Sequence, residues 1–339
     1  MIYTFYEFKS RLTAEQVKNR AMEFAGAKHL TALASMLKLE KHQLTLLAGK
    51  PGYDRFHIPK PKGGKRLIET PRRDLKKAQR RLSQWLQCVY YTLKPPSAFG
   101  FIISPENDPT PCNIYTNAAA HIGREWVLNV DLKDFFHQIT QEKVKQIFLG
   151  PPFQFTPKAA RCMARLTTFK SRLPMGAPTS PVLSNFACRE MDQHIIQLAQ
   201  KQDWTYTRYA DDITLSSKEE ITPESLQMIR QTIQADGFDI NPDKVRISHI
   251  DDKPEVTGLV LGKKPDVSKQ FIKGIKADIQ MFQNMTSDRM ISRDIFSQRE
   301  IVKLQRSIKG QINFVAFVRG KDHKSCRKLR QRLEGKDLR

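Results

Sequence analysis

Two adjacent aspartates, Asp211 and Asp212, lie between aromatic and β-branched segments in the run Tyr209–Leu215. Such segments favour strands, so we predict a β-hairpin whose two-residue Asp-Asp turn points both carboxylates the same way. At about 4 Å, two such charges repel by roughly 4 kcal/mol at an effective dielectric constant near 20. A protein keeps such a pair by protonating one member or by binding a divalent cation between them. A solvated acidic turn is the alternative.

A third carboxylate, Asp131, ends a segment whose apolar residues Val127, Leu128 and Val130 predict a buried strand. Carboxylates at the ends of neighbouring strands can hold two Mg²⁺ ions roughly 3.5–4 Å apart, which is the arrangement that drives in-line phosphoryl transfer. We therefore predict that Asp131, Asp211 and Asp212 are catalytic and that they bind two Mg²⁺ ions.

The composition indicates a large basic protein. A chain of 339 residues can bury a sizeable core and form two or three lobes. It carries 57 Lys and Arg against 35 Asp and Glu, a net charge of +22, which favours a polyanionic partner. Residues 262–339 hold 20 of these basic residues and 8 of the acidic ones, so this part alone contributes +12. A basic protein without a polyanionic partner is the alternative.

The chain has no run of 18 apolar residues, and its start lacks the basic region of a signal peptide, so we expect a cytoplasmic protein with no membrane partner. The five cysteines are odd in number and scattered, which predicts neither a disulfide framework nor a Cys-x-x-Cys zinc site. We expect reduced thiols.

An apolar strand that ends in Asp131, followed by the YADD hairpin, resembles the palm of reverse transcriptases. The resemblance extends over roughly residues 30–320 and includes further motifs in the same order. Asn117 and His121 match the NAxxH signature of retron reverse transcriptases, and Val256–Gly258 matches their VTG signature. Leu173–Pro181 matches the LPQG-x-P-x-S-P motif that retron and group II intron enzymes share, with Met175 in place of the usual Gln.

The resemblance implies an α+β right-hand polymerase fold with fingers, a palm of antiparallel sheet plus helices, and a helical thumb. The expected divisions are an N-terminal helical region at 1–50, fingers with part of the palm at 51–125, palm at 126–260 with fingers elements within 145–180, and a basic helical thumb at 261–339.

The resemblance also implies roles for particular residues. A basic hairpin could clamp triphosphate oxygens, a bulky Phe136 could exclude a ribose 2′-hydroxyl, and Lys244 could donate a proton to departing pyrophosphate. The alternatives are a solvated basic face, a core position for Phe135 and Phe136, and a surface lysine. The expected nucleotide-binding residues are Lys65, Arg66, Phe136, Met175, Gly176 and Lys244. The expected RNA- or primer-binding residues are Asn117, His121, Tyr209, Val256, Thr257, Gly258, Lys324, Arg327 and Lys328, with a structural, hydrogen-bonding role as the alternative for His121.

By this resemblance the protein is an RNA-directed DNA polymerase that uses dNTPs to copy part of a cognate, structured non-coding RNA. It would prime from an RNA 2′-hydroxyl, produce a branched RNA–DNA hybrid and serve phage defence beside an effector or toxin protein. Two alternatives stay open. One is a group II intron-like or other prokaryotic reverse transcriptase, and the other is a non-catalytic RNA-binding protein on the same fold.

Overall fold

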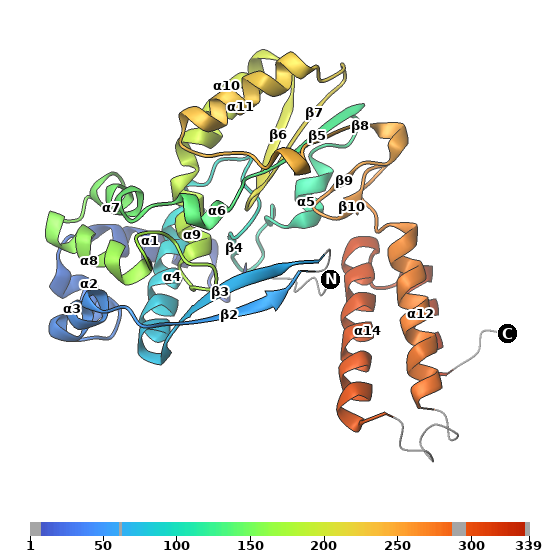
Figure 1. Ribbon diagram of the computed structural model, residues 1–339, viewed down its shortest axis with the longest axis horizontal. Helices are drawn as coiled ribbons and strands as arrows, with labels where there is room; N and C mark the ends of the chain where they lie inside the picture. Colours follow the sequence, from blue (N-terminus) through green and yellow to red (C-terminus); the bar gives the residue numbers. More distant parts are fainter. Residues whose placement is uncertain (1–7, 61–62, 287–295, 336–339) are drawn as a thin grey trace.

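The computed structural model describes residues 8–60, 63–286 and 296–335, and it has the predicted α+β architecture. A four-stranded antiparallel sheet, which we call the palm sheet, has the strand order β6-β7-β5-β8. Its strands are β5 (Trp126–Asp131), β6 (Thr205–Tyr209), β7 (Asp212–Ser217) and β8 (Arg246–His249). Figure 1 shows the long C-terminal helices on the other side of the molecule from α10 (Arg189–Lys201) and α11 (Pro223–Ala235).

Three short helices lie in the predicted N-terminal helical region: α1 (Ala14–Gly26), α2 (Leu30–Met36) and α3 (Lys41–Gly49). Thr13 and Gln16 form a capping box at the start of α1, which satisfies two backbone donors that the helix itself leaves unpaired. Helix α1 packs against α4 (Arg73–Leu93), and α3 packs against α8 (Pro157–Thr167).

The antiparallel hairpin of β2 (Tyr53–Pro59) and β3 (Lys65–Pro71), which we call the fingers hairpin, follows these helices. Near its tip, Gly63 and Gly64 have φ angles of +91° and +82°, a left-handed conformation that glycine adopts without a steric penalty. The glycines therefore allow the tight return of the chain.

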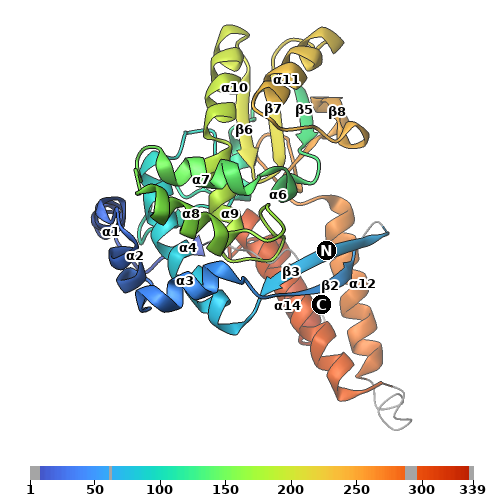
Figure 2. The same cartoon turned by 60° about the vertical axis from the view of Figure 1, so that its left-hand side comes forward.

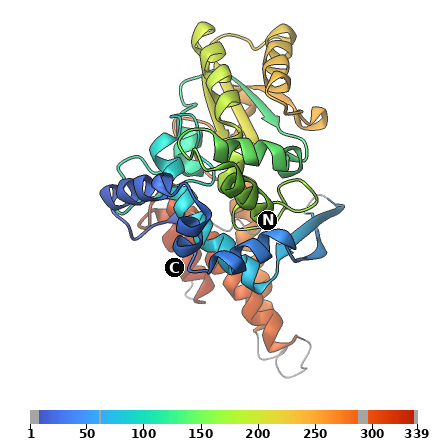
Figure 3. The same cartoon turned by 90° about the vertical axis from the view of Figure 1, so that its left-hand side faces the viewer.

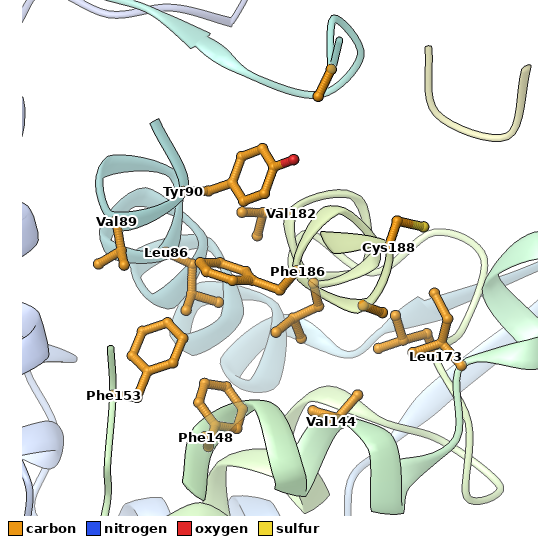
Figure 4. Close-up of a cluster of buried hydrophobic side chains, with 14 of the residues drawn as sticks. Leu86, Val89, Tyr90, Val144, Phe148, Phe153, Leu173, Val182, Phe186 and Cys188 are labelled. Atoms are coloured by element: carbon orange, nitrogen blue, oxygen red, sulfur yellow. The ribbon is translucent and has the colours of Figure 1, made fainter. Parts of the chain in front are cut away.

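A large core joins the N-terminal helices to α4, α8, α7 (Gln141–Leu149) and α9 (Ser180–Ala187). Figure 4 shows Phe148, Phe153 and Phe186 meeting beside Leu86 and Tyr90 of α4. The ring centroids of Phe153 and Phe186 are 5.2 Å apart, and those of Phe148 and Phe153 are 5.4 Å apart. Each such buried side chain contributes roughly 1.5–3 kcal/mol, so this core fixes these helices to one another.

A short hairpin of β9 (Glu255–Val256) and β10 (Leu259–Val260) leads from the palm sheet to three basic helices, α12 (Lys269–Met285), α14 (Gln298–Arg319) and α15 (Lys324–Leu333). Their apolar residues form a second core, in which Ile275, Ile279, Ile308, Ile312 and Val315 are buried. Figures 2 and 3 show the palm sheet in the upper part of the molecule and α12 and α14 pointing away from it below.

The remaining elements are short. Strand β1 pairs in parallel with β4. These short elements are the strands β1 (Phe8–Lys9) and β4 (Ile103–Ser104), the helices α5 (Ile114–Ala119) and α6 (Phe135–Gln138), and the 3₁₀ turns η1 (Pro242–Lys244) and η2 (Ile250–Asp252).

Within the described residues, no helix combines the length and the apolar composition that a membrane crossing requires. The cysteines are buried and unpaired, as expected for reduced thiols: Cys88, Cys112, Cys162, Cys188 and Cys326.

Candidate active site

The three predicted catalytic carboxylates lie at one end of the palm sheet. Asp131 is the last residue of β5 and pairs directly opposite Asp212, the first residue of β7. Asp211 precedes Asp212, and its carbonyl oxygen accepts a hydrogen bond from the backbone N–H of Leu132 at 3.0 Å. Two residues far apart in the sequence are thus joined by a strand ladder, and the prediction that they assemble is confirmed.

The predicted Asp-Asp turn is wrong by one residue. Tyr209 pairs with Asp212 in the β6–β7 ladder, so the two-residue turn consists of Ala210 and Asp211. Ala210 has a left-handed φ of +59°, a conformation that two-residue hairpin turns use. Asp212 is therefore fixed by the strand ladder, and Asp211 is fixed by the turn.

A buried ion pair that no sequence motif indicates supports this turn. The guanidinium of Arg208 donates to both carboxylate oxygens of Asp192, at 2.8 and 2.7 Å, and to the carbonyl oxygen of Ala210 at 3.1 Å. Tyr206 also donates to Asp192, at 2.6 Å. Because Arg208 and Asp192 are fully buried, losing either partner would leave an uncompensated charge. The only local signal is a charged residue within an apolar strand.

The carboxylates of Asp131, Asp211 and Asp212, which we call the acidic cluster, repel one another. Burial raises the pKa of Asp211, and the nearby Asp131 raises it further, while Lys244 and Arg66 oppose the shift. The side chain of Asp212 reaches solvent, but the surrounding protein displaces much of its water. This desolvation, together with the charges of Asp211 and Asp131, raises the pKa of Asp212 to about 7. A bound cation would relieve this repulsion.

Lys244 supplies the positive charge nearest to the cluster. Its ammonium donates to Oδ1 of Asp131 at 2.7 Å, and η1, which carries it, follows a backbone hydrogen bond from Asn241 to the carbonyl oxygen of Asp131. Among the described residues, no three acidic, histidine or cysteine side chains converge closely enough to enclose a metal ion. The three carboxylates have the donor chemistry of a Mg²⁺ site, but one of them is held by a lysine.

The two basic residues predicted to bind the nucleotide differ in position. Arg66 and Lys65 are adjacent on β3, so they lie on opposite faces of the fingers hairpin, and both are exposed. The charge of Arg66 acts on the pKa of Asp211. Arg66 is therefore close enough to the carboxylates for its charge to lower the pKa of Asp211.

Glu69, which belongs to no recognised motif, links the fingers hairpin to the predicted Met175–Gly176 segment. Its buried carboxylate accepts two hydrogen bonds from Arg172, at 2.7 and 3.2 Å, and its backbone N–H donates to the carbonyl oxygen of Met175 at 2.7 Å. A Cβ on Gly176, whose φ is +123°, would lie 3.0 Å from the side chain of Ile68 and 3.1 Å from the carbonyl oxygen of Glu69. The close approach that Gly176 permits is thus to β3.

The two adjacent phenylalanines after Asp131 have different surroundings. Phe135 is buried and packs near Phe238, with ring centroids 6.2 Å apart. Phe136 is half-buried, stacked on Phe101 with centroids 6.2 Å apart, and keeps part of its ring accessible. This arrangement favours Phe136 over Phe135 as the residue beside a bound sugar.

The predicted RNA-binding residues divide into buried and exposed sets. Asn117, His121 and Val256 are buried, and the side chains of Asn117 and His121 contact protein groups. Tyr209 and the Thr257–Gly258 turn are half-buried, and α15 exposes Lys324, Arg327 and Lys328. The exposed set is available to a nucleic acid. The side chains of Asn117, His121 and Val256 are buried and both nitrogens of His121 have protein partners, so the predicted contact of this set with RNA has no support in this structure.

Comparison with known proteins agrees with this geometry. Residues 58–301 match the family model described as reverse transcriptase (RNA-dependent DNA polymerase). The chain is 33% identical over 237 residues to the retron Mx65 reverse transcriptase of Myxococcus xanthus, covering 64% of this chain and 53% of that protein. It is 32% identical over 281 residues to the retron Mx162 reverse transcriptase of the same organism, covering 70% and 56%. It is 28% identical over 332 residues to the retron Ec86 reverse transcriptase of Escherichia coli, covering 96% and 95%. The chain thus spans about half the length of the two Myxococcus proteins.

Proposed function

Because this chain belongs to the reverse transcriptase family and is similar to its retron-type members, we propose that it is an RNA-directed DNA polymerase that copies a cognate structured RNA. The observation that carries the proposal is the pairing of Asp131 with Asp212 beside Asp211 at the end of the palm sheet. A pure RNA-binding protein would have no use for three mutually repelling carboxylates. We keep the predicted division into fingers, palm (126–260) and thumb as part of this proposal.

The chemistry is phosphoryl transfer at these carboxylates. Asp131, Asp211 and Asp212 would hold two Mg²⁺ ions, which when bound would activate the primer hydroxyl and stabilise charge on the phosphoryl group. The raised pKa of Asp211 and of Asp212 supports this assignment, because a divalent cation is the partner that allows such carboxylates to stay ionised together.

The incoming dNTP would be bound by residues of the fingers hairpin and the palm. Arg66 and Lys65 would contact the triphosphate, and Phe136 would lie beside the sugar and exclude a 2′-hydroxyl. Met175 and Gly176 would line the nucleotide site with backbone groups that β3 holds in place. Lys244 would leave Asp131 and donate a proton to the departing pyrophosphate.

At the level of the biological system, we propose a retron-type role. The template would be a cognate non-coding RNA, primed from one of its own 2′-hydroxyl groups, and the product would be a branched RNA–DNA hybrid. The protein would act in the cytoplasm, in antiphage defence with an effector protein. The similarity to retron reverse transcriptases supports these steps.

The central experiment replaces Asp211 by asparagine and measures Mg²⁺-dependent dNTP incorporation on a primed RNA. We expect incorporation to be abolished while RNA affinity stays within about twofold, because an amide of the same shape cannot replace an ionised metal ligand. Asp322→Asn, at an exposed position outside the site, is the matched control. Near-normal incorporation by the Asp211 variant would rule out the proposed metal site.

A second experiment addresses the retron-type role. Nucleic acid extracted from the purified protein should contain DNA that is covalently joined to RNA. Ribonuclease digestion should leave a short, branched RNA remnant on this DNA. Unbranched DNA as the only product would instead favour the intron-type alternative.

A further inference from the structure

The signature residues Asn117, His121 and Thr257 have no role in the chemistry proposed above, yet Asn117 lies on α5, His121 directly follows it, and Thr257 contacts it. Figure 1 shows α5 between the palm sheet and the β9–β10 hairpin, above the C-terminal helices. Helix α5 contacts β6 on one side and both strands of the β9–β10 hairpin on the other. The two signatures therefore belong to one structural unit.

The β6–β7 hairpin carries Asp211 and Asp212, and we call it the catalytic hairpin. On the palm side of α5, His121 joins the two strands of this hairpin. Its Nδ1 lies 2.7 Å from Oγ of Ser216 on β7, and its Nε2 lies 2.7 Å from Oγ1 of Thr207 on β6. Burial lowers the pKa of His121 to about 3, so the ring is neutral at physiological pH. A neutral imidazole has one donor and one acceptor, and both nitrogens already have a partner, so neither remains for a phosphate or a base.

On the other side, α5 holds the Thr257–Gly258 turn. The Thr257 hydroxyl donates to the carbonyl oxygen of Ile114 at 3.1 Å, and the Asn117 amide approaches the same hydroxyl at 3.5 Å. Ala118 of α5 is fully buried in the core that also contains Val256 of β9. Polar and apolar contacts thus fix the turn to the helix.

The turn itself is strained. Thr257 has a φ of +49° and Gly258 a φ of +80°. A left-handed conformation costs glycine little, but it is a genuine outlier for a β-branched residue. Since Thr257 would not adopt this conformation unaided, the contacts from α5 are what hold the half-exposed turn in its present shape.

We propose that α5 is a joint that sets the position of the Thr257–Gly258 turn relative to the catalytic hairpin, and that Asn117 and His121 are positioning residues and not ligands of the nucleic acid. The proposal rests on the proposed polymerase function. RNA held at the turn is thereby placed in a fixed relation to the carboxylates, which matters most when the first nucleotide is added. Later additions on a generic primed template depend on the palm side of the joint alone.

The contact of α5 with the Thr257–Gly258 turn is tested with Asn117→Ala, Thr257→Val and the double variant, on cognate RNA. We expect each single change to slow addition of the first nucleotide about tenfold, because the primer end is displaced. The double variant should be no slower than Thr257→Val alone, because that change already removes the contact between Thr257 and Asn117. RNA affinity should stay within about twofold, with an unchanged salt slope, since no phosphate contact is lost.

Two outcomes would overturn this. If the two effects multiply, the residues act separately. If RNA affinity falls in step with initiation, they are RNA ligands. Thr257→Ser keeps the hydroxyl and should retain most of the initiation rate, which a purely steric role of the β-branch would not allow. Failure of the unmodified protein to synthesise DNA on any template would contradict the proposed function, and is thereby distinguished from failure of the joint.

The palm side is tested with Thr207→Val and Ser216→Ala, which each remove one partner of His121 with little change in shape. We expect kcat to fall several-fold on both cognate and generic primed RNA, with KM for dNTP and RNA affinity unchanged. Ser248→Ala on β8, for which the described part of the chain shows no side-chain hydrogen bond, is the control. Normal kcat in both variants would show that His121 does not position the catalytic hairpin.

Discussion

Gly100 lies so close to Ala210 that a Cβ on Gly100 would be 2.4 Å from the backbone nitrogen of Ala210. Asn185 fixes Gly100 in this position by donating to its carbonyl oxygen at 2.9 Å. The same Asn185 accepts a hydrogen bond from Arg208 at 3.0 Å. The Ala210–Asp211 turn therefore packs directly against Gly100, which the hydrogen bonds of Asn185 hold in place. The turn has no room to move closer to Gly100.

Replacing Gly100 by alanine should therefore displace the catalytic turn. We expect DNA synthesis to fall about a hundredfold, since a shift of about 1 Å in a catalytic group has this effect. The free energy of unfolding should fall by about 1–3 kcal/mol, as in other overpacked cores. Single-turnover dNTP incorporation and urea denaturation measure the two effects. Gly274→Ala, in α12, should leave synthesis intact and serves as the control, because a Cβ there would meet no neighbouring element within 4 Å.

The raised pKa of Asp212 predicts a pH dependence of stability in the absence of metal. The folded protein keeps a proton on Asp212 up to about pH 7, whereas the unfolded chain releases it near the ordinary value of 3.8. The protonated Asp212 carboxyl therefore contributes stability to the fold. This contribution is fully present below pH 3.8, the ordinary pKa, and is lost as the pH rises through about 7. Asp212→Asn removes this loss, so its Tm in EDTA should rise relative to the unmodified protein between pH 4 and about pH 8.

Added Mg²⁺ should reduce this difference, because a cation stabilises the ionised carboxylates of the unmodified protein. Asp322→Asn, at an exposed position outside the site, is the control. A constant Tm difference between the Asp212 variant and the unmodified protein would show that the Asp212 carboxyl is not desolvated as described.

Sugar selection should depend on Phe136. Phe136→Val shortens the half-buried ring and should raise the ratio of rNTP to dNTP incorporation by about tenfold or more, because rejection here is steric. The matched variant is Phe135→Leu, which should leave the ratio unchanged and lower stability, since Phe135 is a core residue. The opposite pattern would assign the gate to Phe135.

Neutralising the exposed basic residues of α15 should weaken binding of cognate RNA and flatten its salt dependence. Each lost phosphate contact reduces the salt slope by about 0.7–0.9. Synthesis on a generic primed template should fall much less, because the catalytic carboxylates lie in the palm sheet. The variant replaces Lys324, Arg327 and Lys328 together by glutamine.

The control for this variant makes the same change in net charge elsewhere, at the exposed Lys18, Lys41 and Lys50 of the N-terminal region. Equal losses on cognate and generic templates would make α15 a non-specific clamp. An unchanged salt slope would make it a solvated face.

The sequence predicts those parts of the site that local patterns encode. Asp131, Asp211 and Asp212 could be found because apolar alternation marks the strands that carry them. The turn was misplaced by one residue because flanking apolar residues do not determine where a strand ladder begins. Gly100 and Glu69 were missed because their importance lies in contacts with residues distant in the chain. The NAxxH motif shows which residues belong together, but it does not show which way they face.

The link between Glu69 and Arg172 also determines how the fingers hairpin can move. Beyond this ion pair, β2 and β3 run as an exposed ribbon to a tip that contains two consecutive glycines in the left-handed region. The ribbon is thus a lever whose pivot lies near Glu69 and whose free arm carries Arg66. Opening and closing over a nucleotide would bend this arm while the segment at Met175, which a backbone hydrogen bond ties to Glu69, stays still. The residues that would contact the triphosphate could thus move without displacing those that would line the rest of the nucleotide site.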